Sequence, residues 1–202
     1  MGCFWAGDSL FGATPGVIRT CVGYAGGLKD NPAYSNLGDH TEVIDIEYDP
    51  EVITYKQLLN LFWNNHEYGL TKFVKRQYIS LILYHNDEQR ILAEKSRDYL
   101  QREKNEKFIT EISPFRKFYP AEDYHQKYRL QQHPWLLENI GLKGGSEDLR
   151  NCPLAAKLNG YLVGVATLDE FERQVPSLGL SDKVLQYVRK YVIERHGNGL
   201  YC

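Results

Sequence analysis

The chain has 202 residues, with 24 Lys and Arg against 26 Asp and Glu, so its formal net charge is only −2. Such a balance gives no basic footprint for nucleic acid or an anionic membrane, and no apolar run approaches the roughly 18 residues that span a bilayer. Four cysteines without a CxxC pair do not form the pattern of a secreted disulfide scaffold or a zinc ribbon. We therefore expect a reducing, cytoplasmic location and no metal ion or cofactor.

The first element places a cysteine at the start of a helix. Cys3 stands beside the aromatic pair Phe4 and Trp5, and the helical stretch behind them ends at Thr14-Pro15-Gly16. Backbone N–H groups and the dipole at a helix start favour thiolate, which is the reactive form of cysteine. Cys3 is thus a candidate nucleophile, with Phe4 and Trp5 as an apolar wall beside it. The alternative is an inert cysteine buried in an aromatic cluster.

Two strands follow, over 17–24 and 41–48. In the second, Ile44, Ile46 and Tyr48 share one parity, which puts Glu42 on the same apolar face. Burial raises the pKa of a carboxyl group, and a protonated carboxylic acid can deliver a proton to a leaving oxygen. Glu42 is therefore a candidate general acid, although Glu is seldom fully buried and a surface carboxylate is the alternative.

The middle of the chain alternates helices with strands. A capping box at Thr54-Tyr55-Lys56-Gln57 starts a helix, and Asn86 caps a longer one. Strands are predicted over 78–84 and 108–112, and a helix over 122–130. Such an alternation favours an α+β or α/β layer fold.

A boundary is predicted at Lys143-Gly144-Gly145-Ser146, which divides the chain into a catalytic domain, 1–145, and a helical extension, 146–202. In the extension a capping box begins at Thr167 and another helix begins at Ser181. The glycine-containing end, 197–202, predicts a flexible tail that carries Cys202.

Several short blocks in this chain occur in the order found in one enzyme family. They are Gly2-Cys3-Phe4-Trp5, Val22-Gly23-Tyr24-Ala25-Gly26-Gly27, Asn31-Pro32-Ala33-Tyr34, Gly38-Asp39-His40-Thr41-Glu42, Tyr48-Asp49-Pro50, Phe62-Trp63-Asn64-Asn65-His66, Gln77-Tyr78-Ile79-Ser80 and Phe118-Tyr119-Pro120-Ala121-Glu122-Asp123-Tyr124-His125-Gln126. The chain thereby resembles the peptide methionine sulfoxide reductases of the A class from residue 2 to about residue 135. The resemblance implies an α+β fold: a two-layer α/β sandwich with a mixed sheet and a ferredoxin-like core, here followed by the helical extension.

The resemblance also implies an activity and a site. The activity is thiol-dependent reduction of the S epimer of methionine sulfoxide, free or in proteins, which is a repair reaction under oxidative stress. Cys3 matches the nucleophile and Glu42 the catalytic acid, while Tyr34 and Tyr78 match two phenols that hydrogen-bond the sulfoxide oxygen. Phe4 and Trp5 would then bind the methyl group of the substrate.

Turnover requires a second thiol, because attack on the sulfoxide leaves a sulfenic acid on Cys3. The Gly-Tyr-Cys segment typical of the family after its His-Pro region is absent, so Cys21, Cys152 and Cys202 are the candidates. Cys21 lies in a predicted strand with fixed geometry, whereas Cys202 ends a tail that can swing, so we expect Cys202 to resolve Cys3, with Cys152 as the alternative or a relay. The resemblance implies that thioredoxin then reduces the disulfide of this monomeric enzyme.

Departures from the family pattern leave other interpretations open. The segment 67–76 is shorter than usual and lacks the family's Asp, for which Glu67 is a possible substitute, and Ile79 replaces the usual Arg. His40, His66 and His125 would suit a Cys–His thiol hydrolase or acyltransferase, with His125 the best placed of the three, but we expect each of them to have a structural role. A third possibility is a methionine-binding protein or redox scaffold without catalytic activity.

Overall fold

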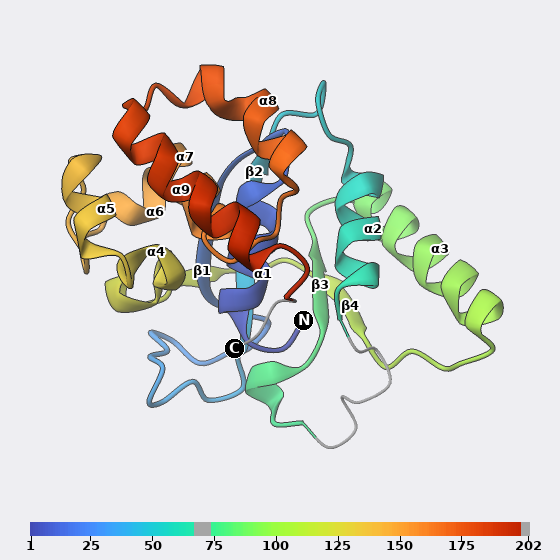
Figure 1. Cartoon of the computed structure of the whole chain (residues 1–202). Helices are drawn as coiled ribbons and strands as arrows, with labels where there is room; N and C mark the ends of the chain where they lie inside the picture. Colours follow the sequence, from blue (N-terminus) through green and yellow to red (C-terminus); the bar gives the residue numbers. More distant parts are fainter. Residues whose placement is uncertain (67–73, 199–202) are drawn as a thin grey trace. The chain divides into compact units, whose positions relative to one another are not determined.

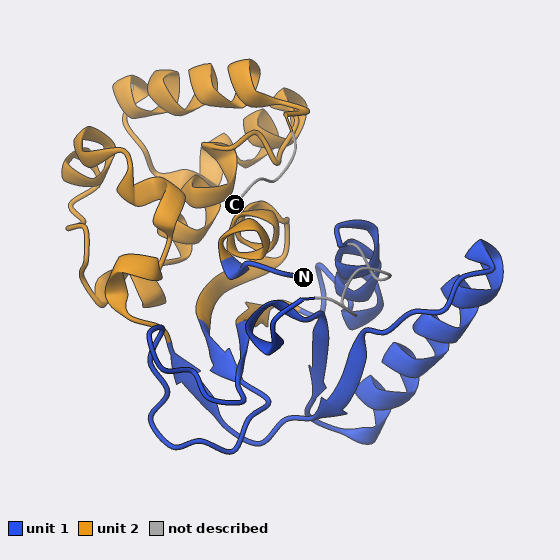
Figure 2. Cartoon of the chain, turned by 90° about the horizontal axis from the view of Figure 1, so that it is seen from below, with its two compact units in different colours: residues 1–4, 23–43, 50–120 blue, residues 5–22, 44–49, 121–202 orange. Residues whose placement is uncertain are grey.

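The computed structural model describes residues 1–66 and 74–198 and resolves the chain into two compact units (Figures 1 and 2). The first unit comprises Met1–Phe4, Gly23–Val43 and Pro50–Pro120, and the second comprises Trp5–Val22, Ile44–Asp49 and Ala121–Cys202. The predicted limits of 1–145 and 146–202 stay a prediction, because a compact unit does not mark where a folding domain ends. Over 1–66 and 74–198, no helix combines the length and the apolar composition needed to cross a bilayer.

The strands in the described part of the chain form two small sheets. One contains β1 (Val17–Ala25), β2 (Thr41–Tyr48) and β5 (Phe118–Pro120) in the order β2–β1–β5, with β1 and β5 antiparallel. The other pairs β3 (Leu81–Tyr84) with β4 (Glu111–Pro114) in parallel. Small sheets of both orientations among many helices make this a mixed α/β protein, in agreement with the predicted alternation of elements.

Two capped helices build the remainder of the first unit. In the predicted capping box of α2 (Tyr55–Asn64), the Thr54 hydroxyl accepts the Gln57 N–H at 3.3 Å, and Gln57 Oε1 accepts the Thr54 N–H at 2.8 Å. The Asn86 side chain caps α3 (Asp87–Lys104) by accepting the Gln89 N–H at 2.9 Å. Helix α3 packs against β3 and β4, and α2 packs against α3 (Figure 1). Helix α3 lies between β3 and β4 in the chain and is the crossover connection that a parallel pair of strands requires.

Two predicted strands have the wrong bounds. The strand predicted over 78–84 begins only at Leu81, because Tyr78 lies in a 3₁₀ turn, η2 (Arg76–Tyr78). The Tyr78 N–H there donates to the Lys75 carbonyl at 2.8 Å, a local hydrogen bond that competes with sheet pairing. The strand predicted over 108–112 begins at Glu111, as β4.

Helices dominate the second unit. They are α1 (Phe4–Ala13, from Trp5 onward), η3 (Asp123–His125), α4 (Tyr128–Gln131), α5 (Pro134–Asn139), α6 (Asp148–Asn151), α7 (Pro153–Tyr161), α8 (Leu168–Leu178) and α9 (Asp182–Arg195). The capping box predicted at Thr167 and the helix predicted after Ser181 are confirmed as the starts of α8 and α9. Their core is an apolar cluster that includes the buried side chains of Leu158, Tyr161 and Phe171.

A buried ion pair organises the second unit. Lys127 Nζ lies 3.2 Å from Asp8 Oδ1, and both side chains are fully buried. Asp8 also accepts the Thr20 hydroxyl at 2.5 Å, the Lys127 N–H at 3.1 Å and the Asn159 amide at 3.3 Å. Lys127 has φ +50°, so the helix predicted over 122–130 is broken into η3 and α4. The network joins α1, β1 and α7 through one carboxylate.

Two glycines let α1 and α7 approach closely. A Cβ atom on Gly160 would lie 2.2 Å from the Ser9 carbonyl oxygen, and one on Gly12 would lie 2.3 Å from the Ala156 carbonyl oxygen. Both clashes are with backbone, which a side-chain rotation cannot relieve. Only glycine therefore fits at these two positions.

We predict that Gly160→Ala lowers the free energy of unfolding by about 1–3 kcal/mol, because the added methyl group must push the two helices apart. Urea denaturation followed by circular dichroism measures the change. Gly144→Ala is the matched control, since its added Cβ would have no neighbour closer than 3.4 Å. Equal midpoints for the Gly160 variant and the unsubstituted chain would show that the helices adjust without cost.

Candidate active site

A buried carboxyl group, that of Glu42, lies at the start of helix α1. Glu42 is the second residue of β2 and is only 5% exposed. Its Oε2 accepts the N–H of Phe4 at 3.0 Å, and its Oε1 accepts the side-chain amide of Gln77 at 2.8 Å. Because Phe4 directly follows Cys3, the structure brings the predicted acid beside the predicted nucleophile.

Opposing influences act on the protonation of Glu42. Burial raises its pKa above the ordinary value, whereas the hydrogen bonds from Gln77 and Phe4 act in the other direction. Burial penalises the carboxylate and N–H donors favour it. A carboxyl group under both influences can release a proton and regain it, as a general acid must.

Cys3 directly precedes α1 and is half-buried. Its neighbour Phe4 is 2% exposed, and the Phe4 ring packs near that of Tyr24 with 6.1 Å between centroids. Trp5 belongs to the second unit, where its ring stacks on Tyr128 with 3.7 Å between centroids. Phe4 thus lies with Cys3 and Glu42 in the first unit. That Phe4 and Trp5 together form an apolar wall beside Cys3 stays a prediction.

The two predicted phenol donors lie together in the first unit. The hydroxyl oxygens of Tyr34 and Tyr78 are 3.4 Å apart, a long hydrogen bond. This contact raises the pKa of Tyr78 above its ordinary value, with further contributions from burial and from the negative charge of Glu42 and Cys3. Tyr78 therefore keeps its proton and is available as a hydrogen-bond donor.

The turn η2 connects these groups. Gln77 donates to Glu42, and the next residue, Tyr78, meets Tyr34. The turn is fixed to β2 by the Thr41 hydroxyl, which donates to the Arg76 carbonyl at 3.0 Å. The role of Gln77 was missed by the sequence analysis. Its place beside Tyr78 in the Gln77-Tyr78-Ile79-Ser80 block was the available signal.

The loop that carries Tyr34 is held by its own side chains. Asp39 accepts the N–H groups of Leu28 and Lys29 at 2.8 and 3.2 Å, and these hydrogen bonds lower the pKa of Asp39. His40 is buried, accepts the Gly27 N–H on Nδ1 and contacts the Lys29 carbonyl through Nε2 at 2.8 Å. Both ring nitrogens of His40 are thus used to shape the loop.

The histidines do not support a Cys–His base. Both ring nitrogens of His66 are also used, one by the Phe62 carbonyl at 2.7 Å and the other by the Thr110 hydroxyl at 3.0 Å. Burial lowers the pKa of His66 to about 4. His125 is buried in the second unit against the rings of Trp5 and Tyr124.

The other thiols occupy different environments. Burial raises the pKa of Cys21, on β1, to about 11, which makes it a poor nucleophile at neutral pH. Cys152 is half-buried at the start of α7, where its sulfur accepts the Ala155 N–H at 3.4 Å. Cys202, like Glu67, lies outside the described residues. Across 1–66 and 74–198, no three His, Cys, Asp or Glu side chains are grouped to hold a metal ion.

Comparisons with known proteins identify the family of this chain. The family model described as "Peptide methionine sulfoxide reductase" matches residues 1–152. The chain belongs to this family. It is therefore an oxidoreductase by descent, and the Cys–His hydrolase interpretation receives no support.

Individual proteins named peptide methionine sulfoxide reductase are also similar to this chain. A protein of that name from Drosophila melanogaster is 52% identical over 203 residues, which cover all of this chain and 82% of the fly protein. The archaeal "Peptide methionine sulfoxide reductase MsrA" of Methanococcus maripaludis is 42% identical and covers 68% of this chain and 92% of its own length. Mxr1 from Saccharomyces cerevisiae in reduced form superposes with a TM-score of 0.58 at 30% identity over 66% of this chain and 82% of its own.

Proposed function

We propose that this chain reduces the S epimer of methionine sulfoxide, free or within proteins, and that Cys3 is the nucleophile. The observation that supports this most is the hydrogen bond from the Phe4 N–H to the Glu42 carboxyl group at 3.0 Å. Sulfoxide reduction needs a nucleophile for sulfur and an acid for oxygen. Both candidates lie at the start of α1.

The chemical step transfers one oxygen atom and two electrons. The Cys3 thiolate attacks the sulfoxide sulfur, and Glu42 gives its proton to the sulfoxide oxygen. The attack joins the two sulfur atoms. The protonated oxygen then moves to the Cys3 sulfur as a hydroxyl group while the S–S bond and the S–O bond of the substrate break, so the products are methionine and Cys3 sulfenic acid. Tyr34 and Tyr78 donate hydrogen bonds to the oxygen as charge develops on it. Phe4 and Trp5 bind the methyl group.

The reactive protonation state follows from the site. Two negative charges beside one helix start would repel each other, so ionisation of either Cys3 or Glu42 disfavours ionisation of the other. The helix start favours the thiolate. Burial favours the neutral acid at Glu42. Thiolate on Cys3 with a protonated Glu42 is therefore the state in which the reaction begins.

The second half of the cycle consumes the sulfenic acid. A second thiol displaces water from Cys3 and forms a disulfide, which a thioredoxin dithiol then reduces. Cys202 is our first candidate for this thiol and Cys152 the alternative or relay, because the raised pKa of Cys21 disfavours its thiolate. Membership in the reductase family supports the thioredoxin step.

We predict that Cys202→Ser leaves the first turnover intact and lowers thioredoxin-supported cycling about tenfold or more, while recycling by dithiothreitol is spared. Cys152→Ser is the matched variant, and both are assayed as methionine formed per enzyme over time. Impairment of both variants indicates a relay through Cys152. Normal cycling of Cys202→Ser together with loss in Cys152→Ser would transfer the role to Cys152.

An assay with separate epimers tests the proposed function. Dithiothreitol-driven reduction of the S sulfoxide, with the R sulfoxide and an ester substrate as controls, distinguishes a reductase from a hydrolase. Thiol titration before and after one equivalent of sulfoxide distinguishes both from a redox scaffold, which would lose no thiols. Hydrolysis of the ester without sulfoxide reduction would overturn the proposal.

The proposal includes the cellular setting and the finer fold. A thiol cycle of this kind requires a reducing compartment, and we infer the cytoplasm and a monomeric enzyme. The similarity to solved members of the family supports a two-layer sandwich with a ferredoxin-like core.

A further inference from the structure

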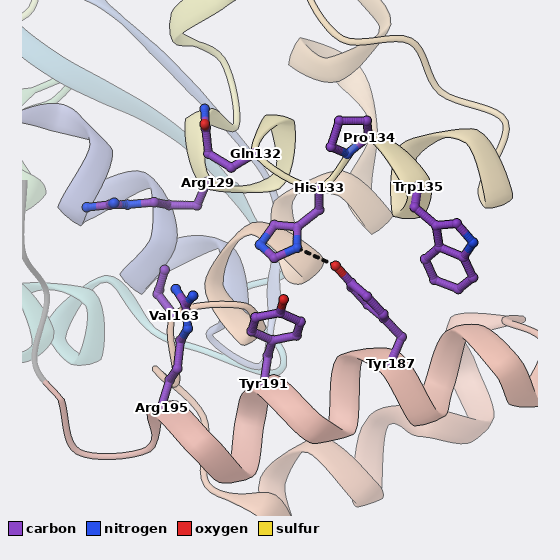
Figure 3. A pocket seen from close by; sticks show the side chains of 9 residues that line it. All are labelled: Arg129, Gln132, His133, Pro134, Trp135, Val163, Tyr187, Tyr191 and Arg195. Atoms are coloured by element: carbon purple, nitrogen blue, oxygen red, sulfur yellow. Dashed lines mark hydrogen bonds between the residues drawn. The ribbon is translucent and has the colours of Figure 1, made fainter.

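A cavity lined by none of the residues of the thiol site lies within the helical second unit. It has a volume of about 380 Å³, at the small end of the range of ligand pockets. Its lining consists of Arg129, Gln132, His133, Pro134, Trp135, Val163, Tyr187, Tyr191 and Arg195. Tyr187, Tyr191 and Arg195 recur every four residues and so lie on one face of α9, and His133 reaches toward Tyr187 and Tyr191 from the other side (Figure 3).

The walls of this cavity are flat aromatic rings held in place by one another. Tyr187 is hydrogen-bonded through its hydroxyl to His133 Nδ1 at 2.7 Å (Figure 3). The His133 ring stands edge-on to Tyr191, with 4.7 Å between centroids and 88° between planes. The Trp135 ring packs on the Tyr187 ring with 4.8 Å between centroids. Preorganised rings of this kind suit a planar ligand that stacks on them, because the rings lose little conformational entropy when the ligand binds.

The charge of the cavity has one sign. Arg129 and Arg195 both line the cavity, the Arg129 guanidinium lies 5.9 Å from the centre of the Tyr128 ring, and none of the nine described lining residues is acidic. The Arg195 guanidinium lies 5.0 Å from the centre of the Tyr191 ring, so its positive charge adjoins the aromatic wall. Burial, and then the positive charge of Arg195, lower the pKa of His133, so the field of Arg195 reaches the ring. A guanidinium group can bind a phosphate or carboxylate group through two parallel N–H···O hydrogen bonds.

We propose that this cavity is a binding site for a small aromatic oxyanion, a planar ring that carries a phosphate or a carboxylate group. The ring packs on the aromatic wall formed by Tyr187, Tyr191 and Trp135, and the anion binds the Arg195 guanidinium group, while Arg129 adds a second positive charge to the lining. The site uses no residue of the thiol chemistry, so this inference stands apart from the proposed function and can fail without it.

Isothermal titration of the full chain at constant ionic strength tests the proposal, with four probes. Phenyl phosphate and benzoate carry a ring and an anion, inorganic phosphate carries the anion alone, and benzyl alcohol carries the ring alone. We expect the first two to bind measurably more tightly than the last two, and the stronger of the pair identifies the anion. The signals of the His133 ring and the Trp135 indole in NMR spectra should shift with the same saturation curve.

Two charge variants on α9 locate the site. Arg195→Gln should weaken phenyl phosphate about tenfold or more, since it removes a charged hydrogen-bond donor. Lys190→Gln removes an equal charge from the same helix but does not line the cavity, and it should change affinity less than about twofold. Reductase activity should be unchanged in both. Equal loss in the two variants, or no saturable binding of either ring-bearing anion, would overturn the proposal.

Discussion

Replacement of Cys3 with serine is expected to abolish sulfoxide reduction. The hydroxyl group keeps the shape of the side chain at the start of α1, but it does not ionise at neutral pH and cannot form a sulfenic acid. Single-turnover mixing of the variant with S sulfoxide, followed by chromatography of methionine, should give no product above the reaction without protein.

Cys21→Ser is the control for this experiment. Its thiol lies on β1 with a pKa raised to about 11, so its removal should leave the first turnover nearly unchanged. Activity of Cys3→Ser above background would mean that another group attacks the sulfoxide, and the mechanism would then have to be abandoned.

Glu42→Gln is expected to lower the rate of the first turnover by about 10²–10⁴-fold, the usual contribution of a positioned general acid. The amide oxygen can still accept the Phe4 N–H, so the start of α1 should be preserved, but an amide has no proton to release to the sulfoxide oxygen. Substrate affinity, measured on a Cys3→Ser background, should change much less than the rate.

The pH profile carries a second signature of the same residue. Burial raises the pKa of Glu42, and only the protonated form, which prevails below that pKa, can act as the acid. The rate should therefore fall as the pH rises through this pKa, which gives the profile a descending limb. This limb should be absent from Glu42→Gln. Glu47→Gln, on the same strand but exposed and paired with Arg19, should retain both the rate and the limb. A near-normal rate in Glu42→Gln would make Glu42 structural and leave Glu67 as the next acid to test.

Local patterns in the sequence predicted much of this structure. The alternation over 41–48 put Glu42 on the inner face of its strand, and the residue is 5% exposed. Capping boxes at Thr54 and Thr167 predicted the starts of α2 and α8, because they depend on residues only three positions apart. Signals of this short range can be interpreted without knowledge of the tertiary fold.

The rest depends on contacts between distant residues. The Phe4 N–H finds its acceptor 38 residues later, and Gln77 finds the same carboxyl group 35 residues earlier. The 3₁₀ turn at Tyr78 interrupts a segment whose composition is typical of a strand, and the φ of Lys127 accompanies its contact with Asp8. No propensity or spacing within one segment encodes such pairs. The chain's place in its family supplied part of that information, but not the donor role of Gln77.

The ion pair of Asp8 and Lys127 has a consequence for hybrid proteins. The two residues are 119 positions apart, and removal of either one leaves a buried charge without compensation, at a cost of about 3–5 kcal/mol. A crossover between this chain and a homologue anywhere from 9 to 126 therefore separates the two partners. If the other parent lacks the same pair, such a chimera inherits half of it, whereas exchange outside that interval keeps the pair intact.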